Sequence, residues 1–219
     1  VNLTGLTAGT AYSVQIAAKD AAGNSSDLSN AVTFETEAAA SAGCNATAGS
    51  NYSEGFEAGI ADWTQSTNDD FNWTRRSGST PSNRTGPSSA TEGSFYMYVE
   101  SSAPNYSTKT AFFNSPCYDL TGTENATFGF KYHLYGSAAM GSLTLQASND
   151  NGASWNDVWN KSGNQGNSWQ TATVDMSAYS AGTVQLRFKG TTGTTWQGDM
   201  AIDAISMTDG AVATPTAVN

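Results

Sequence analysis

The chain has 219 residues, which is enough for one large domain or two small ones. Only 13% of the residues are charged and 38% are apolar, so solubility has to come from Ser, Thr, Asn and Gly rather than from Lys and Glu. The net charge of −10, with nine basic residues and no cluster larger than Arg75-Arg76, argues against nucleic-acid binding.

Apolar segments in this chain are short. None approaches the ~20 residues that a membrane-spanning helix needs, so we expect no membrane insertion. None shows a helical period over ten or more positions, whereas alternation of apolar and polar residues is frequent. The sequence therefore predicts an all-β protein.

Residues 1–37 are predicted to form three strands, the first near Leu3. Residues 12–18 alternate apolar and polar side chains, and Val32 and Phe34 mark the last strand. The sequence pattern L-x-x-L-x-A-G-T-x-Y-x-V-x-I-x-A-x-D-x-x-G-N resembles the second half of a fibronectin type III domain, which has an immunoglobulin-like fold. The resemblance implies that the tyrosine of this motif, Tyr12, bonds backbone a few residues upstream.

Residues 38–51 read as a linker of small residues that Cys44 ties down. The only other cysteine is Cys117, and the two are too far apart for a zinc knuckle. A disulfide between them would close a loop of about 73 residues and stabilise the fold by roughly 4 kcal/mol. The alternative is two buried free thiols, but the polar, lysine-poor composition favours an oxidising extracellular setting.

The clearest strands lie near the middle of the chain. Residues 128–134 and 143–147 each place large apolar side chains at alternate positions. The octet from Ser148 to Trp155 resembles the S-x-D-x-G-x-x-W Asp-box hairpin, for which we favour a structural role. We expect Trp155 and Trp159 to begin the next strand and to close the hairpin over the core.

Residues 52–209 carry an ordered series of motifs. In chain order they are F-E, W, D-D-F-x-W, S-G-x-T-P, T-G-P, Y-x-Y-V-E, S-P, F-x-Y-H-x-Y-G, G-x-L-x-L, G-x-Q-G-x-x-W-Q and A-I-D-x-I-S. The series resembles a MAM domain over nearly its whole length. This implies an antiparallel jelly-roll β-sandwich that serves as a non-catalytic extracellular recognition or adhesion module.

The sequence departs from the usual MAM pattern at two positions. Thr127 stands where a cysteine is common, and Ala204 replaces a common second aspartate. Secreted bacterial proteins carry MAM-like modules with a single bridge, a pattern that fits Cys44 and Cys117. Residues 210–219 are interpreted as a linker to a following module, and within them Thr214 to Asn219 resembles the opening of another fibronectin-like domain.

A structural calcium ion is expected where the first and last strands of a jelly roll lie side by side. Calcium takes six to eight oxygen ligands, and converging carboxylates without a cation would repel. The candidate ligands are Glu57, Asp70 and Asp203, with Asp62 or Asp199 helping. The alternative is that these carboxylates accept hydrogen bonds at turns.

Catalysis is not expected of this chain. Paired carboxylates need a fixed separation across a cleft, and the neighbouring Asp69 and Asp70 should point apart on extended backbone. Asp199 and Asp203 are the other candidate pair, and the single histidine, His133, has no partner nearby in sequence. H-E-x-x-H and G-x-S-x-G motifs are absent. A larger parent protein could still be a secreted hydrolase or protease.

Exposed aromatic side chains are the candidate ligand-binding residues. Most of the six tryptophans should serve the core, but Trp196 lies in a polar loop, with Tyr135 and Tyr106 as weaker candidates. Three arginines, at positions 75, 76 and 84, are expected to pair with acidic side chains at 69 and 70 rather than to bind an anionic glycan.

The sequence thus predicts a module of a secreted or cell-surface multidomain protein, which binds a protein partner or spaces its neighbours. The alternative is a carbohydrate-binding module that holds a parent hydrolase on its polysaccharide.

Overall fold

The computed structural model describes residues 5–7, 10–36 and 43–210, in two compact units divided between Ser41 and Ala42. The first unit is a two-stranded antiparallel ribbon of β1 (Ala11–Val14) and β2 (Val32–Glu35). Residues 5–7 are not a strand, so two strands are described here instead of three, and Leu3 lies outside the described residues.

One hydrogen bond in this ribbon agrees with what the fibronectin resemblance implies. The backbone N–H of Thr7 donates to the Tyr12 hydroxyl at 2.7 Å, which is the bond that the resemblance implied. Ile16, Leu28 and Val32 are exposed because two strands supply no second layer to cover them. The fibronectin type III assignment itself stays a prediction.

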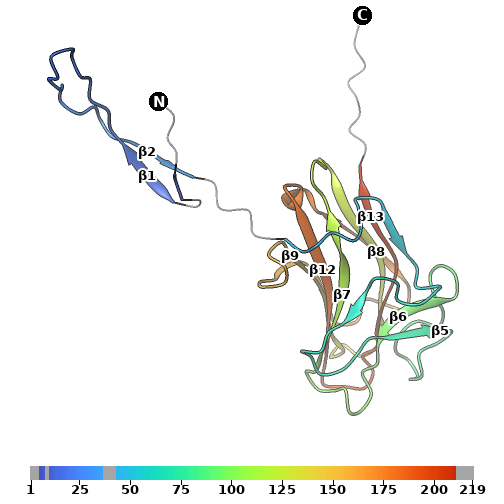
Figure 1. Ribbon diagram of the computed structural model, residues 1–219. Helices are drawn as coiled ribbons and strands as arrows, with labels where there is room; N and C mark the ends of the chain where they lie inside the picture. Colours follow the sequence, from blue (N-terminus) through green and yellow to red (C-terminus); the bar gives the residue numbers. More distant parts are fainter. Residues whose placement is uncertain (1–4, 8–9, 37–42, 211–219) are drawn as a thin grey trace, which may run out of the picture. The chain divides into compact units, whose positions relative to one another are not determined.

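The second unit is a sandwich of two antiparallel sheets (Figure 1). Its strands are β3 (Tyr52–Glu54), β4 (Thr64–Gln65), β5 (Thr74–Ser77), β6 (Phe95–Val99), β7 (Thr110–Asp119), β8 (Ala126–Leu134), β9 (Gly141–Ser148), β10 (Asn156–Ser162), β11 (Gln170–Asp175), β12 (Thr183–Thr192) and β13 (Met200–Asp209). One sheet has the order β10-β9-β12-β7-β4, and the other has the order β11-β8-β13-β6-β5 with β3 added to β13. The predicted all-β jelly-roll sandwich is confirmed.

The core between the sheets is aromatic. Phe188 of β12 lies against Phe130 of β8 with ring centroids 4.9 Å apart, and it also meets Trp63, Trp73 and Phe128. All five side chains are 3% exposed or less. The alternation read from the sequence therefore marks the residues that face the opposite sheet.

The Asp-box hairpin is present and its role in the fold is structural. The Asp150 carboxylate accepts hydrogen bonds from the Ser148 hydroxyl and from both the N–H and the hydroxyl of Ser154. These bonds, those of Ser154 first, lower the pKa of Asp150 to about 2. The indole N–H of Trp155 donates to the Gly152 carbonyl, so the turn is closed by its own side chains.

The two tryptophans at this hairpin point to opposite faces, which corrects the expectation for Trp155. Trp159 packs edge-on against Phe130 in the core at 5.0 Å. Trp155 instead lies 4.1 Å from the Arg187 guanidinium on the outer face of the sheet. A β-bulge in β10 between Asp157 and Trp159 shifts the register between them.

The predicted disulfide between Cys44 and Cys117 is confirmed, with the two Cα atoms 5.9 Å apart. The backbone N–H groups of Thr47 and Ala48 donate to the Cys117 carbonyl, and Ala48 pairs in parallel with Tyr118. Part of the expected 38–51 linker is thus bonded to the sandwich. The rest of that linker, 38–42, and the tail from 211 onward lie outside the described residues.

Candidate functional site

Connections that leave β6, β8, β10 and β12 meet at one end of the sandwich, which we call the loop end. They are residues 100–109, 135–140, 163–169 and 193–199. Hydrogen bonds join them: the Ser101 hydroxyl donates to the Trp196 carbonyl, and the N–H of Ser137 donates to the Gln197 carbonyl. The loop end is therefore a fixed surface rather than a set of independent loops.

A long connection between β5 and β6, residues 78–94, crosses the outer face of the six-stranded sheet. We call it the clasp. Together with Trp169, which packs against Tyr96 at 5.8 Å and against His133 at 5.5 Å, it covers Tyr96, Tyr98 and His133, and these three are at most 4% exposed. The six-stranded sheet is thus covered on both faces along these strands.

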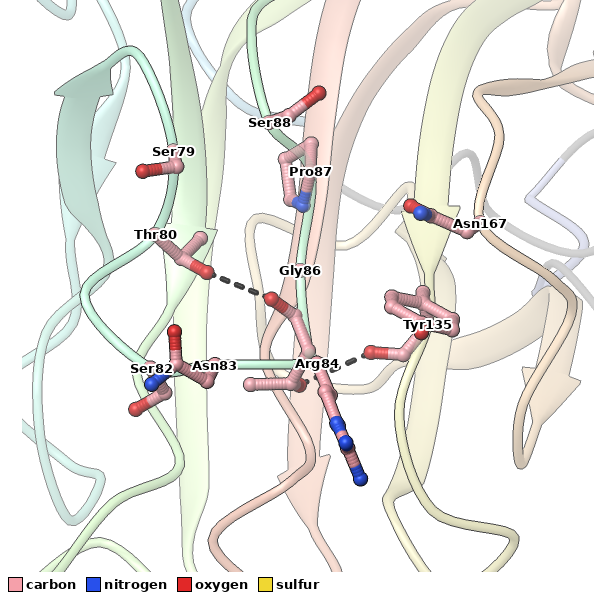
Figure 2. Close-up of a pocket in the computed structure, with 11 residues that line it drawn as sticks. Ser79, Thr80, Ser82, Asn83, Arg84, Gly86, Pro87, Ser88, Tyr135 and Asn167 are labelled. Carbon is pink, nitrogen blue, oxygen red and sulfur yellow. Dashed lines mark hydrogen bonds between the residues drawn. The ribbon is translucent and has the colours of Figure 1, made fainter.

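The clasp forms a polar cleft at the loop end (Figure 2). The cleft has a volume of about 270 Å³ and is lined by Ser79, Thr80, Ser82, Asn83, Arg84, Thr85, Gly86, Pro87, Ser88, Tyr135 and Asn167. The Thr80 hydroxyl donates to the Thr85 carbonyl at 2.8 Å, and the Tyr135 carbonyl accepts from the Thr85 hydroxyl and the Gly86 N–H. No Asp, Glu, His or Cys is among the residues that line it, so the Ser, Thr and Tyr hydroxyls of the lining have no carboxylate, imidazole or thiolate beside them there.

Asp199 is buried under the clasp and helps to hold it. Its N–H donates to the Thr85 hydroxyl at 2.8 Å, and one carboxylate oxygen accepts from the Ser101 N–H at 3.1 Å. Gly86 has a φ of +66°, and a Cβ there would lie 2.6 Å from Thr80 and 3.1 Å from the Asp199 Cβ. Burial raises the pKa of Asp199 to about 7.

The three predicted ligand-binding aromatics all lie at the loop end. Trp196 and Tyr106 are 43% and 40% exposed, and they are the large apolar side chains exposed on the described part of the sandwich. Tyr135 is half-buried and forms one wall of the cleft. No ring contact joins the three among the described residues, so each presents its own surface. Ligand binding by them stays a prediction.

The structure does not bring together the predicted calcium ligands Glu57, Asp70 and Asp203. Glu57 accepts hydrogen bonds from the N–H groups of Ser94 and Phe95, and Asp203 accepts from Thr91 in the clasp at 2.9 Å. Both therefore serve the six-stranded sheet.

Asp70 lies at the edge of the other sheet. Its carboxylate accepts from the Thr110 N–H at 2.7 Å and pairs with the Lys109 ammonium at 3.1 Å, and these bonds lower the pKa of Asp70. The described residues contain no group of three or more His, Cys, Asp or Glu side chains that could hold a metal ion. The carboxylates accept hydrogen bonds, which was the alternative. Calcium binding stays a prediction without a ligand set.

The expected pairing of arginines with Asp69 and Asp70 is wrong. The Arg75 guanidinium lies 3.4 Å from the centroid of the Phe95 ring, and Arg76 donates to the Ser79 carbonyl. Arg84 is exposed at the cleft. Strand pairing explains the difference, because β5 joins the six-stranded sheet whereas the aspartates bond to β7 of the other sheet.

His133 is buried against aromatic rings and does not lie on a free surface. It is 2% exposed and packs against Trp169 with ring centroids 5.5 Å apart. Burial lowers the pKa of His133 to about 4, so the imidazole is neutral at pH 7. A second buried layer could have been inferred from Tyr96 and Tyr98, which place two large rings on the outward parity of β6.

These features define an all-β, disulfide-closed jelly-roll domain with a polar cleft and two exposed aromatics at its loop end. The family model described as "MAM domain, meprin/A5/mu" matches residues 55–211. The chain therefore belongs to the MAM domain family. No helix in the described part of the chain has the length and apolar character to cross a membrane.

Similar proteins carry the same family name. The chain is 36% identical over 159 residues to the human MAM domain-containing glycosylphosphatidylinositol anchor protein 1, and 35% identical to that of Gallus gallus; each match covers 69% of this chain. It is 29% identical to the human MAM domain-containing protein 2 over 71% of this chain. The matches span only 16% to 22% of the relatives' own lengths. The domain is extracellular or at the cell surface.

Two solved structures show the same fold. The K2 adhesin domain of Lys-gingipain aligns with a TM-score of 0.52 and 17% identity, over 72% of this chain and 99% of that one. The K1 adhesin domain of Lys-gingipain from Porphyromonas gingivalis W83 aligns with a TM-score of 0.50 and 20% identity, over 74% and 99%.

Proposed function

We propose that the domain is a non-catalytic recognition module that binds a protein partner at its loop end, as part of a larger extracellular protein. The observation that carries the proposal is the exposure of Trp196 and Tyr106 on loops fixed by hydrogen bonds. Tryptophan, tyrosine and arginine dominate the energetics of protein interfaces. Arg84 adds an exposed guanidinium at the neighbouring cleft.

Rigidity supports this choice. The carbonyl of Trp196 accepts from Ser101, and the Tyr106 loop is bonded to β12 through Thr108 and Thr192. Ordering such a surface on binding costs little, because its backbone is already fixed. A module that only spaced its neighbours would need no exposed aromatics here, and a polysaccharide ligand is the competing class at this end.

The test is binding of the fluorescently labelled chain to beads that carry the same chain and to cells that produce the parent protein. We expect saturable binding that is lost when surface proteins are removed with protease and retained after glycosidase treatment. Trp196→Ala and Tyr106→Ala should each weaken binding about tenfold.

Leu28→Ala is the control, since Leu28 is 63% exposed on the first unit. Binding that survives protease treatment would contradict the proposal. Equal binding by Trp196→Ala and the wild type would do so as well.

A further inference from the structure

The outer face of the five-stranded sheet carries two rows of side chains across its strands. One row contains Asn114, Arg187, Gln146 and Asp157, and the next contains Phe112, Lys189, Thr144 and Asn160. Their chain neighbours Phe113, Phe188 and Leu145 are buried in the core, so the rows point away from it. Thr144 and Gln146 are only 6% and 8% exposed, so the groups that the face presents are the charged side chains, the amides of Asn114 and Asn160, and the Phe112 ring around them.

These side chains are held in place by one another. Arg187 donates to the Gln146 amide oxygen at 2.7 Å, and Gln146 donates to the Asp157 carboxylate at 2.6 Å. The guanidinium lies 4.0 Å from the centroid of the Phe112 ring and 4.1 Å from that of Trp155. A ligand that binds here meets groups whose freedom is already restricted, which reduces the entropic cost of binding.

A hollow lies where this face meets the 66–72 loop. It has a volume of about 370 Å³ and is lined by Asn68, Asp69, Asp70, Thr110, Phe112 and Lys189. One oxygen of Asp69 accepts from the Phe112 N–H at 2.6 Å. Among the described residues no hydrogen bond or ion pair engages the Lys189 ammonium, so it is free to donate.

The charges of the two rows, of the hollow and of the Lys109 that pairs with Asp70 cancel, although the chain carries −10 overall. Asp69 and Asp70 line the hollow with Lys189, Asp70 pairs with Lys109, and Arg187 and Asp157 flank Gln146 in one row. An anionic ligand would therefore meet no net attraction. The large exposed apolar side chains that anchor protein interfaces are all elsewhere, among them Trp196 at the loop end.

We propose that this face binds a neutral oligosaccharide chain, with one sugar ring seated in the hollow against Phe112. Sugar hydroxyls both donate and accept, which matches a surface that offers the Lys189 ammonium, the Asn68 amide and the Asp69 carboxylate together. The proposal goes beyond protein recognition at the loop end and uses none of its residues.

Isothermal titration of the whole chain with neutral soluble polysaccharides tests it, using a β-glucan, a xylan, a galactan and a mannan, with heparin as the anionic comparison. At least one neutral polysaccharide should bind saturably. Lys189→Ala and Asn68→Ala should each weaken that binding about tenfold. Phe112→Ala should weaken it further, and near-UV circular dichroism would show whether each variant keeps its packing.

Trp196→Ala is the matched control and should leave the affinity within about twofold. Binding that is lost in Trp196→Ala and kept in Lys189→Ala would overturn the assignment and move the glycan to the loop end. Binding to heparin alone, or to no polysaccharide of the panel, would also overturn it. The loop-end proposal is independent, since its own variants are read out on cells.

Discussion

Removing the disulfide should lower the free energy of unfolding of the sandwich by about 4 kcal/mol on the chain-entropy model. The bridge joins residues separated by 73 positions, so breaking it releases a long loop in the unfolded chain. The measurement is urea denaturation of the Cys44→Ala/Cys117→Ala double variant against the wild type. Alanine at both positions avoids leaving a free thiol near β7.

Local contacts provide the control for this experiment. The backbone N–H groups of Thr47 and Ala48 donate to the Cys117 carbonyl and that of Asp119 donates to the Ala48 carbonyl, and none of these bonds involves a sulfur atom. If the bridge acts on the unfolded state, hydrogen exchange at these amides should follow global unfolding in both proteins. Fraying confined to these amides, with a global loss below about 1 kcal/mol, would contradict the entropic account.

The sandwich could be predicted because its strands follow the simple rule of one buried face. Phe128 and Phe130 on β8, and Leu143 and Leu145 on β9, alternate as expected and are fully or almost fully buried. The disulfide could be predicted because a chain with two cysteines offers a single pairing. The MAM resemblance added the order of the elements, which periodicity does not supply.

The site was harder to predict because its residues meet through loops. His133 and Tyr98 lie on the outward parity, and sequence alone does not show that the clasp covers that face. The sequence could not show that Asp70 and Asp203 lie on different sheets, because the order of the motifs does not show which sheet each carboxylate reaches. Thr144 and Gln146 read as an ordinary solvated strand face, whereas burial to 6% and 8% exposure shows a packed polar layer.

The stability of the sandwich should fall as the pH rises from about 4 to about 8, and two aspartates under the clasp are the cause. Burial raises the pKa of Asp203 to about 6 and that of Asp199 to about 7. The folded state therefore holds protons that the unfolded state has released. Full ionisation costs roughly 3 kcal/mol for Asp203 and roughly 4 kcal/mol for Asp199.

His133 acts in the opposite direction over part of this range. Because burial lowers its pKa to about 4, folding disfavours the charged imidazole, and stability recovers by roughly 3 kcal/mol as the pH rises toward its unfolded value of about 6.5. The expected net loss between pH 4 and pH 8 is about 4 kcal/mol. At pH 6.5 the imidazole of the unfolded chain is still half protonated, so the contribution of His133 fades over the next pH unit, and the slope that remains near about pH 7.5 belongs mainly to Asp199.

Urea denaturation at intervals between pH 4 and pH 8 measures this dependence, and an Asp199→Asn/Asp203→Asn variant isolates its cause. Asparagine keeps an oxygen that accepts from Ser101 at position 199 and from Thr91 at position 203. The variant should lose the fall above pH 6.5 and keep the rise due to His133. A wild type whose stability rises steadily up to pH 8 would show that these carboxyls are ionised in the folded state. The clasp would then be held by charged acceptors rather than by protonated acids.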